Sequence, residues 1–469
     1  MSAAVDVSSI VNAIDDGSAH GIATTLNRLI RTGYLAVGTR LPTVRSLARE
    51  LGVSPTTVND AWRSLARVGA IETRGRNGSY VSGDSHQAEP VRFWRLAGAA
   101  GHFACDLSAG VPDPALLPPL GPALAGIDGQ PPLSGYLDNP VLPDLEKLVR
   151  DAWREVCDPE QLTIVDGSLD GLDRVLTSLL HLGDRVIVEN PTFPPFLDLL
   201  DVLGASPTPV AMDDHGVRPE ALRAAVQRGN VVAFLLQPRA QNPTGASMTA
   251  ARARELATVV RAAPRESPPV PGVSSGLVVI EDDHAGDTAL AAPASLANEL
   301  PDQVVRIHSF SKSHGPDLRL AAMGGPAAII EPVVARRHLG ASWSSRLLQE
   351  VLVGMLTDPA SRAAVAQARD VYAMRRAALQ EALANQGVPS TGWDGINLWV
   401  QVGQEREAMV ALATQGIGVA PGSPFLVAPI GADHVRVTTS VLPDEQAPAV
   451  ADAMARAAHS AAVPSGVRK

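Results

Sequence analysis

The sequence predicts an α/β protein in two parts, a small, mainly helical segment near the N-terminus and a large body with a mostly parallel central sheet. Beyond residue 106, short apolar stretches rich in β-branched residues alternate with stretches of helical periodicity, which is the pattern of parallel strands joined by helices. Between residues 20 and 82 the periodicity is mainly helical and the charge is basic. With 469 residues, the chain is long enough for two or three domains and a large buried core.

The overall composition is that of an ordinary globular protein, with 45% apolar and 19% charged residues. No apolar run approaches the roughly 20 residues that a membrane span requires. The N-terminus also lacks the basic region and apolar segment of a signal peptide. Cys105 and Cys157 are too few for a disulfide framework and lack the spacing of metal ligands. We therefore expect a cytoplasmic protein without membrane contact.

Charge separates the two parts of the chain. Residues 20–82 contain nine arginines and three acidic residues, a net charge of +6, although the whole chain carries −10. A basic segment joined to an acidic body favours a polyanionic partner for that segment alone.

The order of helix starts and stops within residues 20–82 predicts a helix-turn-helix. A first amphipathic helix covers residues 22–32. A second helix follows residues 41–43 and ends at Gly52, since glycine is favoured directly after a helix. The third helix begins at once, with Ser54 as its N-cap and Pro55 in its first turn. In such a motif the last helix lies in the major groove of DNA.

We expect a wing after these helices, because two short predicted strands, at residues 71–73 and 79–81, flank a tip rich in glycine and arginine. The first turns of the last helix and the wing tip can both reach a nucleic acid. The alternative is a small helical packing domain whose charges are only solvated. The candidate contact residues include Thr56, Thr57, Asn59, Arg74 and Arg76.

The segment resembles the winged helix of GntR-type bacterial regulators. The motifs are Leu41-Pro42-x-x-Arg45, Leu51-Gly52-Val53-Ser54-x-Thr56-Thr57-Val58 and the glycine-rich wing. The resemblance implies DNA contacts from Arg45, Thr56, Thr57, Arg74 and Gly75. Pro55 stands where some members carry a DNA-contacting arginine, so we expect a different base specificity. Residues 1–19 are expected to be a tail or short helix, residues 20–82 the DNA-binding domain and residues 83–105 a linker.

The run from Ser309 to Arg319 contains Lys312, in a chain whose basic residues are mostly arginine. Only three of the 39 basic residues are lysines. An amine can form a Schiff base with an aldehyde, whereas a guanidinium cannot, because it keeps its proton. The neighbouring serines and the arginine could hold a phosphate. The alternative is a solvated loop lysine.

Polar and aromatic side chains follow several strands of the body, where ligands of parallel sheets bind. The loop through Ser168 and Leu169 enters a helix and presents backbone amides to a phosphate. Phe193 could stack on a flat ring, and Asn242 is held on a turn. The expected strands are 162–165, 185–189, 231–236, 277–281 and 303–308.

Asp282 lies at the end of one of these strands, where a carboxylate can pair with a pyridinium nitrogen and keep the ring electron-withdrawing. The alternative is a metal site formed by Asp282, Asp283 and His284. No further cluster of His or Asp at ligand spacing supports that alternative. We therefore expect no metal.

Residues 106–455 resemble the fold-type I aminotransferases, which bind pyridoxal 5′-phosphate. The resemblance implies a central, mostly parallel sheet and a smaller C-terminal α+β subdomain within residues 106–469. It makes Lys312 the residue that forms the Schiff base, Asp282 the partner of the pyridine nitrogen and Asn242 the partner of the 3-oxygen. Phe193 takes the stacking position, usually a tyrosine or tryptophan. The phosphate-binding positions fall on Ser168, Ser309, Ser311 and Arg319.

Three further residues complete this resemblance. Arg436 matches the arginine that binds the α-carboxylate of a substrate. Tyr136 resembles the tyrosine that reaches the phosphate of a partner subunit, which implies a homodimer. His284 stands where relatives have a tyrosine that binds the 3-oxygen, so efficient transamination becomes doubtful.

A GntR-like winged helix followed by an aminotransferase-like body identifies the chain as similar to the MocR type of bacterial transcription regulator. The implied function is pyridoxal-phosphate-dependent regulation of a promoter, with the body sensing an amino acid or a vitamin B6 species at Lys312. Its implied partners are double-stranded DNA, that small molecule and a second copy of the chain. One alternative is a working aminotransferase that carries a DNA-binding head. Another is a scaffold that has lost the cofactor.

Overall fold

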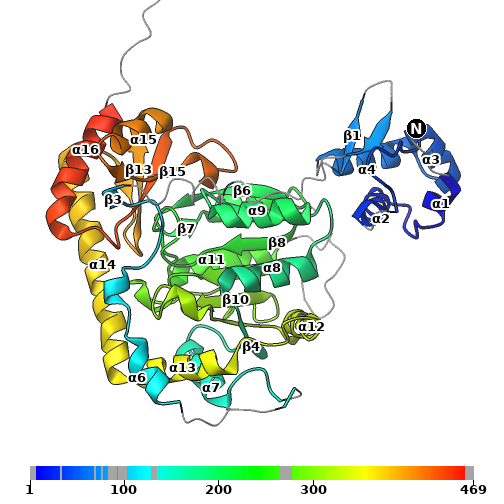
Figure 1. The fold of residues 1–469 in the computed structure, drawn as a ribbon. Coiled ribbons are helices and arrows are strands. Elements are labelled where there is room, and N and C mark those ends of the chain that lie inside the picture. Colours follow the sequence, from blue (N-terminus) through cyan, green and yellow to red (C-terminus); the bar gives the residue numbers. More distant parts are fainter. Residues whose placement is uncertain are drawn as a thin grey trace, which may run out of the picture. The chain divides into compact units, whose positions relative to one another are not determined.

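The structure is a computed structural model that describes residues 7–31, 34–67, 70–74, 78–82, 92, 103–127, 135–136, 138–229, 231–263 and 277–459. The chain forms two compact units, one built mainly from the first 91 residues and the other from most of the remainder (Figure 1). We call residues 7–82 the head and residues 103–459 the body, and describe each by itself. Gly75, Arg76, most of the expected linker and the proline-rich residues 264–272 lie outside the described ranges.

The head has the helices and wing that the sequence predicts. Its elements are α1 (Val7–Val11), α2 (Ala19–Arg31), α3 (Val44–Leu51), α4 (Pro55–Arg67), β1 (Ile71–Thr73) and β2 (Ser79–Val81). Gly52 ends α3 with a φ of 68°, which a glycine adopts without strain. The Ser54 hydroxyl caps α4 by accepting a hydrogen bond from the Thr57 backbone N–H at 3.1 Å. Strands β1 and β2 pair antiparallel, as expected for a wing.

The core of the head is formed by the apolar faces of its helices. Ile22 and Leu26 of α2, together with Val58 and Leu65 of α4, are fully buried. Burial of each such side chain contributes about 1.5–3 kcal/mol. Ile10 of α1 joins the same cluster, so part of the N-terminal segment belongs to the core of the head.

The body is organised around an eight-stranded mixed sheet with the order β4-β11-β10-β9-β8-β5-β6-β7. Strand β9 runs parallel to both β8 and β10, whereas β11 runs antiparallel to its neighbours β10 and β4. Strands β4, β8, β9 and β10 therefore end at the same edge. The strands are β4 (Gln161–Val165), β5 (Arg185–Asn190), β6 (Ser206–Asp213), β7 (Gly216–Val217), β8 (Val231–Leu236), β9 (Val278–Asp283), β10 (Val304–Ser309) and β11 (Ala321–Gly325).

Helices cover both faces of this sheet. Helices α8 (Ser168–Leu179) and α12 (Ala327–Arg337) contact one face, which we call the α8 face. The other face, which we call the α7 face, packs in one apolar cluster with α7 (Pro143–Trp153), α10 (Pro219–Val226), α11 (Ala250–Arg261) and α13 (Arg346–Thr357). Strand alternation therefore decides to which of two environments each strand side chain is delivered. The body also contains α6 (Leu120–Ala125) and α9 (Pro194–Leu203).

The C-terminal part of the body is the smaller α+β subdomain expected from the sequence. It contains an antiparallel sheet, β12-β13-β16-β15, and the helices α15 (Glu405–Ala413) and α16 (Ala447–His459), with the long α14 (Pro359–Asn385) leading into it (Figure 1). The strands are β12 (Ser390–Thr391), β13 (Asn397–Val402), β15 (Ala420–Pro421) and β16 (Asp433–Thr438). At the start of the body, β3 (Cys105–Asp106) pairs with β14 (Ile417–Gly418) of this subdomain.

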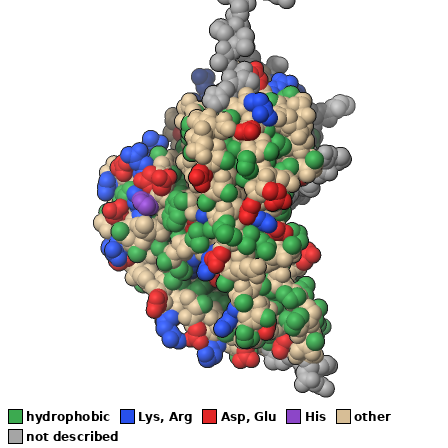
Figure 2. Space-filling view, turned by 90° about the vertical axis from the view of Figure 1, so that its left-hand side faces the viewer, with side chains coloured by type: hydrophobic (Ala, Val, Ile, Leu, Met, Phe, Trp, Pro, Cys, Tyr) green, Lys and Arg blue, Asp and Glu red, His purple; other side chains and the backbone are tan. Residues whose placement is uncertain are grey.

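The described helices include none that is both long and apolar enough to cross a bilayer. On the face drawn in Figure 2, basic and acidic side chains are interspersed, with apolar side chains between them. This mixture is ordinary for a protein surface.

Candidate functional site

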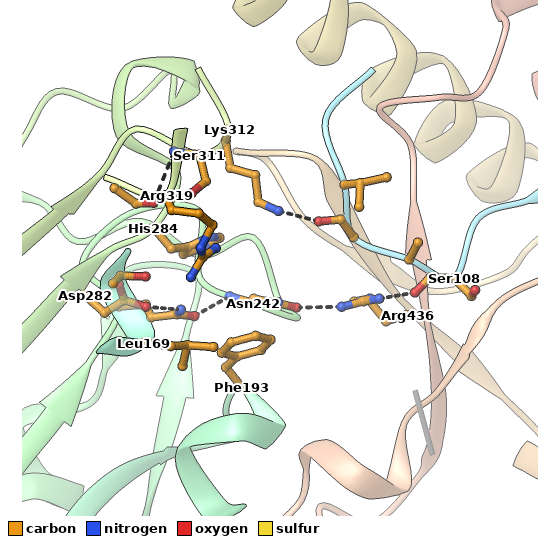
Figure 3. Close-up of a pocket in the computed structure, with 16 residues that line it drawn as sticks. Ser108, Leu169, Phe193, Asn242, Asp282, His284, Ser311, Lys312, Arg319 and Arg436 are labelled. Atoms are coloured by element: carbon orange, nitrogen blue, oxygen red, sulfur yellow. Dashed lines mark hydrogen bonds between the residues drawn. The ribbon is translucent and has the colours of Figure 1, made fainter. Parts of the chain in front are cut away.

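A cavity of about 380 Å³ lies at the edge of the sheet where β4, β8, β9 and β10 end. Strand β10 delivers Ser309 to it. Asp282 comes from β9, and Ser311 and Lys312 follow β10 (Figure 3). Every cofactor residue expected from the sequence lines it except Tyr136, and so does Arg436. The lining residues are Ser108, Ala109, Gly110, Val111, Ser168, Leu169, Phe193, Gln237, Asn242, Asp282, His284, Ser309, Ser311, Lys312, Arg319 and Arg436.

The Asp282 carboxylate is buried in the cavity wall and only half paired. Its Oδ2 accepts a hydrogen bond from Gln237 Nε2 at 2.9 Å, but its Oδ1 has no hydrogen-bond partner among the described residues. Burial raises the pKa of Asp282 to about 7, although Gln237, Ser168 and Lys312 oppose the shift. A buried carboxylate oxygen without a partner is unfavourable. The carboxyl group therefore suits a ligand that brings a protonated nitrogen, such as a pyridinium.

Gln237, which the sequence analysis did not single out, connects Asp282 to Asn242. Its Oε1 accepts a hydrogen bond from the Asn242 backbone N–H at 2.9 Å. Figure 3 shows the hydrogen bonds continuing from Asn242 through Arg436 to Ser108. The position of Gln237 directly after β8, at the ligand-binding edge, is the signal that could have identified it.

Lys312 projects into the cavity as a half-buried amine. Its Nζ donates a hydrogen bond to the Gly110 carbonyl at 2.6 Å. Burial, and next the positive charge of Arg436, lower the pKa of Lys312 to about 8. At pH 7 about a tenth of such an amine is uncharged, compared with less than about one in a thousand for an ordinary lysine. The side chain lines this cavity, which favours a site lysine over the alternative of a solvated loop lysine.

Arg436 is a buried cation that forms no ion pair with any of the described residues. It is 3% exposed, and burial lowers the pKa of its guanidinium to about 10. Its Nη2 donates to the Ser108 carbonyl and its Nη1 to Asn242 Oδ1 at 3.4 Å, while Nε has no partner among the described residues. Gly110 allows this close packing, because a Cβ at that position would lie 3.1 Å from Nη1. A guanidinium in this state can bind a carboxylate through two parallel hydrogen bonds.

The other end of the cavity suits a phosphate. Ser168 opens α8, whose N-terminal amides favour anions, and the hydroxyls of Ser309 and Ser311 lie nearby in the lining. Arg319 donates from Nη2 to the Asp166 carbonyl at 3.0 Å. Gly167 has a φ of 100°, and a Cβ there would lie only 2.6 Å from the same nitrogen. A side chain at position 167 would therefore displace the guanidinium of Arg319 from this position.

The imidazole of His284 is neutral and oriented by the backbone. Burial lowers its pKa to about 4. Its Nε2 lies 2.9 Å from the Ala240 carbonyl oxygen, so Nε2 carries the hydrogen and Nδ1 can only accept. A tyrosine hydroxyl could donate to a phenolate oxygen, whereas His284 in this state cannot. Phe193, on the same lining, contacts Phe196 edge-on at 5.4 Å.

The metal alternative for Asp282, Asp283 and His284 is not supported by the geometry. Asp282 faces the α8 side of the sheet and Asp283 the α7 side, because neighbouring residues in a strand point in opposite directions. Asp283 pairs with Arg239 at 2.7 Å and with Arg306 at 2.6 Å. Within the described part of the chain, no group of three or more His, Cys, Asp or Glu side chains is arranged to hold a metal.

Tyr136 lies away from the cavity and is 85% exposed. Its ring contacts Trp343 edge-on at a centroid distance of 6.1 Å. The expected contribution of Tyr136 to a partner subunit stays a prediction.

The expected DNA-contacting residues are distributed over two helices and the wing of the head. Arg45 on α3 and Thr56 on α4 are exposed, while Thr57 and Asn59 are half-buried. Arg74 forms an exposed ion pair with Glu72, and its guanidinium lies 4.9 Å from the centre of the Tyr80 ring. An exposed pair of this kind contributes little stability and can be exchanged for a phosphate.

Comparisons with known proteins match each of the two units to a known family. Residues 105–454 match the family "Aminotransferase class I and II", and residues 19–81 match "Bacterial regulatory proteins, gntR family". The vitamin B6 salvage pathway transcriptional repressor PtsJ of Salmonella typhimurium is 34% identical over 437 residues, covering 92% of this chain and 96% of PtsJ. The pyridoxine biosynthesis regulator PdxR of Corynebacterium glutamicum is 26% identical, covering 79% and 80%.

Among solved structures, the α-aminoadipate aminotransferase LysN from Thermus thermophilus, complexed with N-(5′-phosphopyridoxyl)-L-leucine, aligns with a TM-score of 0.67. The alignment covers 79% of this chain and 95% of LysN at 23% identity, and it shows the fold. The fold and site thus define a gntR-type head joined to a class I and II aminotransferase body. The chain belongs to the MocR-type transcription regulators.

Proposed function

We propose that this regulator binds pyridoxal 5′-phosphate in the body, binds double-stranded DNA with the head, and changes its DNA affinity when a small effector occupies the body. The single observation that carries the proposal is an amine with a lowered pKa, Lys312, in one cavity with the half-paired carboxylate of Asp282. An amine of this kind is prepared to react with an aldehyde. A carboxylate of this kind is prepared to hold a ring nitrogen.

The residues that line the cavity fit each part of the cofactor. Pyridoxal phosphate supplies an aldehyde that condenses with amines and a ring that withdraws electrons. Asp282 would hold the ring nitrogen, Asn242 the 3-oxygen and Phe193 one face of the ring. The phosphate would be bound by Ser168, Ser309, Ser311 and Arg319, with the backbone at Leu169.

The effector in this proposal is an amino acid or a vitamin B6 species. Arg436 would bind a carboxylate, because its guanidinium is buried and forms no ion pair within the described part of the chain. An amino acid would compete with Lys312 for the aldehyde and release the lysine amine. An effector changes DNA binding only if it binds two conformations unequally, and exchange at Lys312 provides such a difference. PtsJ and PdxR, whose names refer to vitamin B6 metabolism, make B6 species natural first candidates.

The alternative function is that of a working aminotransferase carrying a DNA-binding head. Lys312 and Arg436 would both permit it. His284 disfavours it, because an imidazole that donates to Ala240 cannot also donate to the 3-oxygen. Steady turnover of an amino donor and a keto acid, at rates typical of such enzymes, would support the alternative.

Covalent trapping tests the cofactor assignment directly. The purified protein, incubated with pyridoxal phosphate and reduced with borohydride, should carry one adduct per chain, located by peptide mapping at Lys312. With only three lysines in the chain, Lys147→Ala serves as a matched control that keeps the adduct. Lys312→Ala should abolish it. An adduct at Lys147, or no absorbance band beyond that of the protein after cofactor addition, would contradict the proposal and favour a scaffold.

A promoter fragment tests whether effector binding in the body changes DNA binding by the head. DNA affinity of the cofactor-loaded protein, measured with and without amino acids and B6 vitamers, should change with at least one of them. It should not change in Lys312→Ala.

We further propose that the regulator acts as a homodimer in the cytoplasm, with Tyr136 serving the site of the partner subunit. Light scattering of the purified protein tests the dimer.

A further inference from the structure

The imidazole of His284 lines the cofactor cavity with only one of its two nitrogens used by the protein (Figure 3). Its Nε2 lies 2.9 Å from the Ala240 carbonyl oxygen. A carbonyl oxygen can accept but not donate, so the hydrogen is on Nε2. Its Nδ1 makes no hydrogen bond within the described part of the chain. Nδ1 is therefore the group that His284 offers to a ligand.

The Ala240 carbonyl that fixes this hydrogen belongs to a buried set of hydrogen bonds. Ala240 has a φ of 47°, and its backbone N–H donates to the Ser247 hydroxyl at 2.7 Å. That hydroxyl donates in turn to Asp394 Oδ2 at 2.7 Å. Ala240, Ser247 and Asp394 are all buried. The partner of His284 Nε2 is thus held by the packed interior, and the imidazole keeps one orientation.

The free nitrogen accepts and does not donate, because the ring is neutral. Burial, and after it the positive charge of Lys312, lower the pKa of His284 to about 4, although the hydrogen bond with Ala240 opposes the shift. At neutral pH such an imidazole is almost entirely uncharged. Nδ1 then carries a lone pair and no hydrogen.

Asn242 offers the opposite kind of group on the same lining. Arg436 Nη1 donates to Asn242 Oδ1 at 3.4 Å, and a guanidinium has no acceptor, so the amide oxygen faces Arg436. Asn242 Nδ2 is left as a donor, without a hydrogen bond among the described residues. Ala240, which holds His284, comes just before the turn that carries Asn242. One corner of the cavity therefore presents a free donor and a free acceptor.

We propose that His284 and Asn242 together select a protonated hydroxyl at the 3-position of the cofactor ring, with His284 Nδ1 as the acceptor of its hydrogen. This inference rests on the proposed function, because the hydroxyl is that of pyridoxal phosphate. A hydroxyl can accept from Asn242 and donate to His284 at the same time. A deprotonated 3-oxide can only accept, and its charge would face the lone pair of Nδ1. A tyrosine hydroxyl in place of His284 would instead donate to the oxide.

The location of this proton affects the bond between Lys312 and the cofactor. When pyridoxal phosphate is joined to a lysine, one proton is shared between the lysine nitrogen and the 3-oxygen. With His284 as acceptor, the proton stays on the oxygen and the lysine nitrogen is uncharged. The adjoining carbon is then less electrophilic toward an incoming amine. His284 thus favours a regulator that retains its cofactor over an enzyme that turns over amines rapidly.

Absorbance spectroscopy of the protein loaded with pyridoxal phosphate tests this proposal. The 3-hydroxyl form absorbs at shorter wavelength than the form with a 3-oxide and a protonated lysine nitrogen. The shorter-wavelength band should dominate in the unmodified protein at neutral pH, and the longer-wavelength band in His284→Tyr, which supplies a donor. His284→Phe removes the acceptor but keeps an apolar ring, so it separates hydrogen bonding from the effect of apolar surroundings. It should also move intensity to the longer-wavelength band.

Borohydride trapping and peptide mapping of the same samples separate this inference from the proposed function. A Lys312 adduct together with a dominant longer-wavelength band in the unmodified protein would keep the proposed function and overturn the role of His284. An unchanged spectrum in His284→Phe would overturn that role as well. Absence of any adduct on Lys312 would overturn both.

A cofactor analogue provides a measurement on the unmodified protein. 3-O-methylpyridoxal phosphate keeps an acceptor at the 3-oxygen but has no hydrogen to donate. It should bind about tenfold more weakly than pyridoxal phosphate, because Nδ1 is then left without a donor. In His284→Phe the two affinities should become similar. Equal affinities in the unmodified protein would overturn the inference. A difference that persisted undiminished in His284→Phe would do the same, because it would come from the size of the methyl group.

Discussion

The amide of Gln237 provides the sharpest test of how the cofactor cavity is built, and we predict the consequences of Gln237→Met. The substitution keeps side-chain length but removes two hydrogen bonds, to Asp282 Oδ2 and from the Asn242 backbone N–H, each 2.9 Å long. A buried partner left unpaired costs about 1–3 kcal/mol, so the apo protein should lose roughly 2–6 kcal/mol of unfolding free energy.

The cofactor should also bind less tightly in this variant. Gln237 lowers the pKa of Asp282, which is about 7 in the intact cavity. Without the amide that pKa rises further, the carboxyl group is protonated at neutral pH, and its pairing with a ring nitrogen is lost. A hydrogen bond to a charged group is worth about 1.5–3 kcal/mol, which corresponds to a dissociation constant roughly 10- to 100-fold higher. The deficit should shrink as the pH rises well above 7, because Asp282 then ionises in the variant as well.

Gln241→Met is the matched control, since Gln241 is an equally buried amide close by. It donates to the Pro191 carbonyl at 2.9 Å and to Glu189 Oε2 at 3.3 Å, but makes no hydrogen bond to Asp282. Urea unfolding should show that both variants are destabilised, whereas an absorbance titration with pyridoxal phosphate should show weakened binding only in Gln237→Met. Equal loss of cofactor affinity in the two variants would refute the reasoning, because the amide of Gln237 would then act only through stability.

Three further predictions concern other parts of the chain. Arg45→Ala should weaken promoter binding and reduce the slope of log affinity against log salt by about one, as expected for one lost phosphate contact; unchanged affinity and slope in fluorescence anisotropy would remove this residue from the DNA interface. Gly167→Ala should weaken the binding of pyridoxal phosphate about tenfold, because a Cβ at that position would displace Arg319, but it should not change the binding of unphosphorylated pyridoxal. Gly216 serves as the control, because it has a similar φ of 85° and open space where a Cβ would lie. Gly216→Ala should therefore leave both affinities unchanged. The rate of cofactor incorporation, followed by absorbance, should rise with pH and level off above pH about 8, because the pKa of Lys312 is lowered and the free amine is the reactive form. A rate that continued to rise up to pH about 10.5 would contradict the lowered pKa of this amine.

Much of the architecture could be predicted from the sequence because it depends on neighbouring residues. The start of α4 follows from Ser54 and Pro55, and the end of α3 from Gly52. Five strands of the large sheet were predicted from apolar runs, and the carboxyl ends of most of them carry the candidate site, as the rule for parallel strands requires. The antiparallel β11 was not predicted, because its pairing with β10 and β4 depends on partners distant in the sequence.

The sequence by itself determined which chemistry this protein can support: a rare lysine between serines and an arginine, an aspartate at a strand end, and a basic winged helix before them. Only the tertiary structure decided how these groups are tuned. Gly110 accepts a hydrogen bond from a lysine 202 residues away, and Gln237 orients Asp282. The physical reason is that capping and periodicity act within a few residues, whereas burial and hydrogen-bond partners are fixed only when distant segments meet.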